Sequence, residues 1–131
     1  MKWSLQQLNK YTSESLIFTE EYDFSEDAKN VNGVISIGKT VVEGSCKCIG
    51  MEKYKFDLHI EVVLELEDAW TLEPVSYKIV LDVTEIFDRL ESSEDVRVID
   101  KNTVDLYDVI WENILLEIPM RITKEEAKEV N

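Results

Sequence analysis

Cysteine, histidine, glycine and proline are all scarce in this chain of 131 residues, which has two, one, four and two of them. Cys46 and Cys48 are too few for a disulfide framework, and on a β-strand their Cα atoms would lie about 6.5–7 Å apart, beyond the usual disulfide separation. The sole histidine, His59, excludes most zinc-binding and histidine-based catalytic arrangements. The scarcity of glycine and proline excludes a phosphate-binding loop and a proline-rich linker. We interpret both cysteines as small buried hydrophobic residues and His59 as an exposed residue among carboxylates.

Basic side chains are also few, because 14 Lys and Arg stand against 28 Asp and Glu, giving a formal net charge of −14. Such a chain repels a phosphate backbone, which excludes a broad non-specific nucleic-acid binder and suits a basic partner. There is no apolar run of about eighteen residues, the length that a membrane-spanning helix needs. Residues 1–7 turn polar before a signal-peptide core could form. We therefore expect a cytoplasmic protein that does not bind membranes.

The strongest pattern lies in the centre of the chain, where apolar and polar residues alternate from Tyr54 to Leu66. Strict period-two alternation predicts one long strand with a buried face and a wet face. A preceding strand that includes Val42 and Cys48, a hairpin turn at 49–52 and an alternating strand over 75–83 complete a predicted antiparallel meander.

Shorter elements are predicted before the meander. Ser4 and Gln7 have the spacing of a capping box, which predicts a short helix over 4–10. Alternating apolar residues predict a strand through about residue 22. A polar, acidic loop with one helical turn is expected over 23–33.

The last third of the chain changes to helical spacing. Its apolar positions predict a helix over 105–117 that Asp105 caps and that ends by about Leu116, because Pro119 restricts the residue before it. We also predict a mobile loop at 90–96, a short strand at 97–99 and a frayed tail from about residue 122.

Residues 105–121 read DLYDVIWENILLEIPMR. This segment resembles the "Ile/Val-Asp-Leu … Glu-x-Leu-Leu-x-x-Pro-hydrophobic-Arg" signature of the YceD-like large ribosomal RNA subunit accumulation proteins. Leu72-Glu73-Pro74 and the strand after it are similar to that family's Leu-Glu-Pro turn, and residues 1–8 look like the start of Gram-positive members. The resemblance covers nearly the whole chain. It implies a single domain over 1–131 and a role in ribosomal RNA accumulation and ribosome biogenesis, without a defined reaction.

The chain departs from this pattern at its cysteines. Many members carry a cysteine pair before the Leu-Glu-Pro turn and further cysteines in the tail. Here Asp68 and Thr71 stand at the first pair, and Thr123, Ala127 and Asn131 stand at the tail positions. Because structural zinc is held by Cys and His, we predict no structural metal and no cofactor.

We expect an α+β fold, in which a twisted antiparallel meander of about five or six strands carries a short N-terminal helix and a C-terminal helix. A partly closed barrel is the alternative, because long strands tend to curl. The C-terminal helix should pack on the meander with Trp111 in the core. Trp70, beside the Leu-Glu-Pro turn, has two interpretations: a residue at the edge of the core, or an exposed anchor for a partner.

Two functional hypotheses follow, and neither is enzymatic. In the first, a basic ribosomal or rRNA-processing protein docks on an acidic face near Glu61, Glu65, Glu67, Trp70 and Glu73, with indirect association with rRNA. In the second, the chain is an RNA-binding module that uses Lys39, Lys47, Lys53 and Lys55 around the first hairpin. The simplest interpretation of the acidic residues is a solvated surface. A hydrolase or nuclease is disfavoured, because one histidine and scattered carboxylates make no catalytic constellation.

Overall fold

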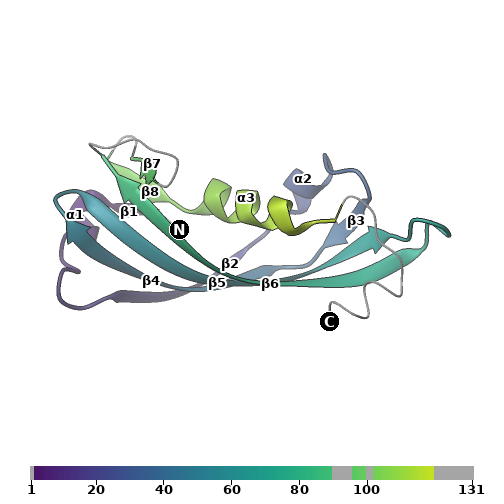
Figure 1. The fold of residues 1–131 in the computed structure, drawn as a ribbon, viewed down its shortest axis with the longest axis horizontal. Coiled ribbons are helices and arrows are strands. Elements are labelled where there is room, and N and C mark those ends of the chain that lie inside the picture. The colour runs from purple at the N-terminus through teal and green to yellow at the C-terminus, as the bar shows by residue number, and fades with distance from the viewer. Residues whose placement is uncertain (1, 90–95, 100–101, 120–131) are drawn as a thin grey trace.

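The computed structural model describes residues 2–89, 96–99 and 102–119, which form mainly β-strands (Figure 1). In chain order the elements are β1 (Lys2–Ser4), α1 (Leu5–Leu8), β2 (Leu16–Tyr22), α2 (Ser25–Ala28), β3 (Val34–Ile37), β4 (Thr40–Gly50), β5 (Lys53–Glu67), β6 (Pro74–Asp88), β7 (Val96–Val98), β8 (Thr103–Asp105) and α3 (Tyr107–Glu117). Most of the predicted loop at 90–96 and the predicted tail from residue 122 lie outside the described residues.

The main sheet has six strands in the order β2-β4-β5-β6-β7, with β3 paired to β5 beyond the end of β4. Strands β4, β5 and β6 are consecutive and antiparallel, which confirms the predicted meander. The predicted strand at 97–99 is β7, which pairs in parallel with the end of β6. The helical turn expected within 23–33 is α2.

The sheet is curved but not closed, so the alternative of a partly closed barrel is wrong (Figure 1). Helix α3 lies across one face of the sheet. The apolar face of the sheet is therefore buried against a helix, whereas in a closed barrel it would be buried against the opposite wall of the same sheet. This leaves the opposite face of the sheet without a covering helix among the described residues.

Burial along β5 follows the predicted alternation. The residues from Tyr54 to Leu66 at even positions are each at most 2% exposed, whereas those at odd positions are half-buried or exposed. One face of this strand therefore belongs entirely to the core.

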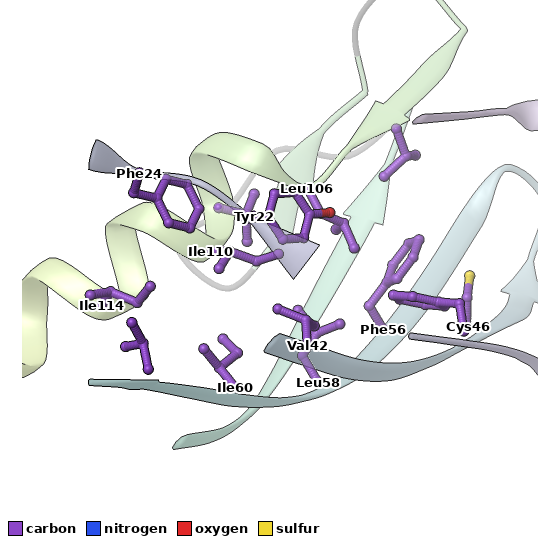
Figure 2. Packing of buried hydrophobic residues seen from close by; sticks show 14 of the residues in the cluster. Tyr22, Phe24, Val42, Cys46, Phe56, Leu58, Ile60, Leu106, Ile110 and Ile114 are labelled. Carbon is purple, nitrogen blue, oxygen red and sulfur yellow. The ribbon is translucent and has the colours of Figure 1, made fainter. Parts of the chain in front are cut away.

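Helix α3 packs through Leu106, Ile110 and Ile114, which are fully buried against side chains from β2, β4 and β5 (Figure 2). Trp111 is half-buried and stacks on Phe24 with ring centroids 5.2 Å apart, at the edge of this core. The predicted packing of the helix is therefore confirmed, but Trp111 lies at the edge of the core and not within it.

The predicted ends of α3 are nearly those of the structure. The Asp105 carboxylate accepts a hydrogen bond from the Tyr107 backbone N–H (3.0 Å), one residue before the N-cap position. The helix ends at Glu117, one residue later than expected. Its C-cap Ile118 adopts the extended backbone that a following proline favours.

Gly44 on β4 makes room for an aromatic cluster. A Cβ atom at this position would lie 2.8 Å from Phe18 Cε2 and 2.9 Å from Leu58 Cδ2, so the Phe18 ring packs directly on the β4 backbone. Phe18 also contacts Trp3, with ring centroids 4.8 Å apart.

A second, two-stranded sheet pairs β1, near the N-terminus, with β8, which lies just before α3. We did not predict this sheet. The predicted capping box is confirmed, because the Ser4 hydroxyl accepts from the Gln7 N–H (3.2 Å) and the Gln7 side chain accepts from the Ser4 N–H (2.9 Å). Helix α1 is shorter than expected, ending at Leu8.

Candidate functional site: the open face of the sheet

The candidate site is the face of the main sheet opposite α3, which we call the open face. It carries the odd-numbered residues of β5 and their neighbours across β3, β4 and β6. The charge of the β5 residues on this face changes along the strand, from lysines at the β4–β5 hairpin to glutamates toward the β5–β6 turn. Most of the predicted lysines therefore lie near one end of the open face, and most of the predicted acidic residues lie near the other.

Three of the four predicted lysines come together at the hairpin end. Lys47 and Lys55 are directly opposed across β4 and β5, and both are exposed. Lys53 is half-buried on the same hairpin. Lys39 lies at the other end of β4, about 25 Å from Lys47 at the usual rise per residue, and forms an ion pair with Glu21 (3.4 Å).

His59 lies in the middle of the open face, between two carboxylates. Its Nδ1 is 2.7 Å from Asp82 Oδ1 on β6, and its Nε2 is 3.2 Å from Glu61 Oε2 on its own strand. Glu61 in turn pairs with Lys78 on β6 (3.5 Å). Glu61 therefore already has partners within the chain, and its membership of a docking face stays a prediction.

These carboxylates raise the pKa of His59, chiefly through the hydrogen bond to Asp82 and then through the bond to Glu61. A shallow open hollow beside the ring is lined by Glu43, Asp57, His59, Asp82 and Thr84, among others. Asp57 hydrogen-bonds Thr84 Oγ1 (2.7 Å) and not the imidazole. The arrangement therefore favours the protonated form of the imidazole.

The acidic end of the open face consists of Glu65 and Glu67, which are both exposed. Their directly opposed neighbours carry no charge, because Glu65 lies between Ser36 and Ser76, and Glu67 lies opposite Pro74. Within the described residues no ion pair reaches either glutamate. Their negative charge is therefore presented to the solvent.

The β5–β6 turn is held in one conformation by hydrogen bonds to Asp68. The buried Asp68 carboxylate accepts hydrogen bonds from the backbone N–H groups of Trp70 (2.8 Å) and Thr71 (3.0 Å). Leu72 has a positive φ of 62° and its N–H donates to the Asp68 carbonyl (2.9 Å). The Trp70 side chain is 76% exposed, so of its two interpretations the exposed position is the one observed. The Asp68 carboxylate therefore caps this turn.

The two cysteines do not form a site. Cys46 is fully buried in the core and burial raises its pKa to about 12, while Cys48 is half-buried and its Sγ lies 3.2 Å from the Gly50 carbonyl. Across residues 2–89, 96–99 and 102–119, no three Cys, His, Asp or Glu side chains are grouped to hold a metal ion. Thr123, Ala127 and Asn131 lie outside these ranges.

Two residues of this face, Lys78 and Asp82, were missed by sequence reasoning. Both lie on the open face of β6, where the β5–β6 register sets them beside Glu61 and His59. No local pattern in the sequence gives that register, because the alternation of β6 shows which residues share a face but not which residue of β5 each one opposes.

Comparison with known proteins agrees with the motifs of the last two thirds of the chain. The model of the family described as "Large ribosomal RNA subunit accumulation protein YceD" matches residues 56–131. The chain belongs to the YceD family. The Bacillus subtilis (strain 168) protein named "Uncharacterized protein YlbN" is 31% identical over 134 residues, covering 98% of this chain and 77% of that protein. No solved structure matches the chain.

The matched region divides the open face. Glu61, Glu65, Glu67, Trp70 and Glu73 all lie within the part that the YceD family model matches, whereas the four predicted lysines precede it. None of the helices in the described part of the chain is long and apolar enough to cross a membrane.

Proposed function

We propose that this YceD-family chain is a non-enzymatic cytoplasmic factor that supports large-subunit ribosomal RNA accumulation by docking a basic partner protein. The family's name supports the link to ribosomal RNA. The docking surface is the acidic end of the open face, formed by Glu65, Glu67 and the exposed Trp70, with Glu73 in the adjoining turn.

The observation that carries the proposal is the uncompensated charge of Glu65 and Glu67 beside an exposed tryptophan. Carboxylates with uncharged neighbours steer a cationic partner, and a tryptophan on a hydrogen-bonded turn supplies the aromatic anchor common at binding hot spots. Most of the carboxylates in the centre of the face are instead bound by His59, Lys78 or Thr84.

Affinity capture of the tagged full chain from a bacterial lysate, at low and high salt and with or without ribonuclease, tests the proposal. We expect ribosomal or rRNA-processing proteins in the low-salt eluate, retained after ribonuclease and lost at high salt. The variant E65K/E67K should lose them. Recovery of neither ribosomal proteins nor rRNA at low salt would contradict the proposal.

A matched control changes the charge equally elsewhere. Glu14 precedes β2 and Glu117 ends α3, and both are exposed. The variant E14K/E117K should capture the same proteins as the unchanged chain. Equal losses in both variants would indicate a response to net charge rather than a docking surface.

The second candidate function is an RNA-binding module at the β4–β5 hairpin. The directly opposed Lys47 and Lys55 favour it, because two exposed ammonium groups at one point can bind a phosphate backbone. RNA binding of this kind should be lost in K53E/K55E and should not survive ribonuclease in the capture experiment. Docking of a basic protein should not weaken in that variant.

A further inference from the structure

One side of β6 is free over most of its length. On its inner side β6 pairs with β5 from Pro74 to Asp88. On its outer side β7 pairs only with Ile86, Phe87 and Asp88. Within the described part of the chain, no strand covers the outer side of Ser76–Thr84.

The backbone of this free segment is oriented for pairing. The Asp68 N–H donates to the Glu73 carbonyl (2.8 Å) and the Arg89 N–H to the Glu52 carbonyl (3.3 Å), which continues the β5–β6 register at both ends. Bonded and non-bonded pairs alternate in an antiparallel ladder, so the odd-numbered β6 residues bond toward β5. The even-numbered residues from Ser76 to Thr84 therefore direct their N–H and C=O groups outward.

The side chains along this edge are complementary to a second copy of the same edge. If two β6 strands pair antiparallel with Val80 opposite Val80, then Lys78 faces Asp82 of the second copy and Ser76 faces its Thr84. On the other face, Ile79 meets Leu81. Opposite charges and apolar or hydroxyl pairs are the favourable cross-strand combinations. Shifting the register by two residues places Lys78 opposite Val80 or Thr84 and removes both ion pairs.

We propose that the outer edge of β6 pairs with the same edge of a second copy of this chain, joining two sheets about a two-fold axis at Val80. The two ends of the free edge lie symmetrically about Val80, as a two-fold axis there requires. In that register Ile86, where β7 begins, lies opposite Pro74, which has no N–H to donate. The paired segment therefore stops where both chains have no further backbone groups to exchange.

A second copy fits this edge better than a charged segment of another protein. The edge from Ser76 to Thr84 carries one lysine and one aspartate and is neutral, although the whole chain is strongly acidic. At a Debye length of about 8 Å in physiological salt, the remaining charges of the two chains are largely screened from each other. A two-fold pair also closes on itself, whereas an open edge of this length would invite unlimited association.

Disulfide trapping tests the position of the axis. In the proposed register the two Val80 Cα atoms lie about 5.5 Å apart, a distance that a disulfide spans. The full chain with Val80→Cys should therefore form a covalent dimer under mild oxidation. The matched control is Val63→Cys, because Val63 is equally exposed (45% against 49%) but lies on the interior strand β5. Trapping of both variants alike, or of neither, would contradict the proposal.

Charge exchange tests the register without a new cysteine. K78D and D82K should each weaken dimerisation about tenfold or more, because two-fold symmetry creates two like-charge pairs. The double variant K78D/D82K restores opposite charges and should return the dissociation constant to within about threefold. K55D makes the same charge change as K78D but lies away from the edge, so it should leave the dissociation constant of the dimer unchanged.

Sedimentation analysis over a range of protein concentrations measures these constants, and circular dichroism confirms that each variant is folded. A chain that stays monomeric up to about 200 μM, a concentration far above the dissociation constant expected of a specific weak dimer, would overturn the proposal. So would a dimer that K78D and D82K leave intact, or one that the double variant does not restore. Glu65 and Glu67 lie on β5, so E65K/E67K should not affect dimerisation, and the two proposals can fail separately.

Discussion

The two faces of the main sheet share the same strands but have different roles. The even-numbered residues of β5 are apolar and almost completely buried on the face that α3 crosses, which we call the covered face, whereas the odd-numbered residues change from lysine to glutamate along the open face. The first set excludes water and holds the fold together. The second set is free to vary in charge without disturbing the core. Substitutions should therefore separate stability from binding according to the face on which they lie.

The sharpest test of this separation is Phe56→Ala. Phe56 is fully buried and contacts the rings of Trp3 (5.6 Å between centroids) and Phe87 (5.4 Å). Its removal should lower the free energy of unfolding by about 3–5 kcal/mol, measured by urea titration. Val63→Ala on the open face of the same strand should change it by no more than about 0.5 kcal/mol. Similar losses from both variants would contradict the separation.

A smaller loss is expected from Gly44→Ala. The added methyl group points toward the covered face and meets Phe18 and Leu58, so it should cost about 1–3 kcal/mol by overpacking. In the background of Phe18→Leu, which provides space, the same change should cost less than it does alone. An unchanged cost in that background would show that the Phe18 ring is not the obstacle. Thermal or urea unfolding of the four chains gives the comparison.

The edge of the covered face holds a charged network that Glu85→Ala should weaken. The Glu85 carboxylate accepts hydrogen bonds from Arg97 Nε (2.7 Å) and from the Asn113 side chain (3.0 Å), and Arg97 also reaches Glu112 (3.1 Å). Because the Glu85 side chain is mostly buried, its loss should reduce stability by about 1–2 kcal/mol. Glu65→Ala on the open face should have no measurable effect in the same unfolding experiment.

The smallest expected effect belongs to His59 and depends on pH. Its pKa is raised in the folded chain, so protonated His59 stabilises the fold fully below its unfolded value near 6.5, and this contribution is lost as pH rises through the folded pKa. His59→Gln should therefore lower the melting temperature at a pH of about 5.5 and not at a pH of about 9.

Proton titration of the single histidine by NMR measures the cause directly. Asp82→Asn should lower the pKa of His59, because it removes the largest contribution to the rise. Asp57→Asn should change it less, since the Asp57 carboxylate binds Thr84 instead. A pKa that is equally insensitive to both changes would contradict the assigned hydrogen bond.

The elements of the fold that could be predicted are those with a clear local sequence pattern, either a long periodic run or a capping motif. The alternation from Tyr54 to Leu66 identified β5, and the Ser4–Gln7 spacing identified the start of α1. The pairing of β1 with β8 could not be predicted, because three residues are too few to show a period and the partners are about a hundred positions apart in the chain. The short strand β3 was likewise missed, because its four residues are too few to show a period.

The candidate site was predictable by strand and face but not by pairing. Glu65 and Glu67 were assigned to the wet side of β5, where they lie exposed. The engagement of Glu61 and His59 by Lys78 and Asp82 depends on which residues of β6 stand opposite them, and a one-residue change of register would remove those contacts.

The pairing of β1 with β8 also orders the events of synthesis. The strand Lys2–Ser4 is translated about a hundred residues before its partner strand Thr103–Asp105. The rings of Phe18 and Phe56 that contact Trp3 are therefore available early in synthesis, whereas the backbone pairing of its strand forms only after β8 has been made.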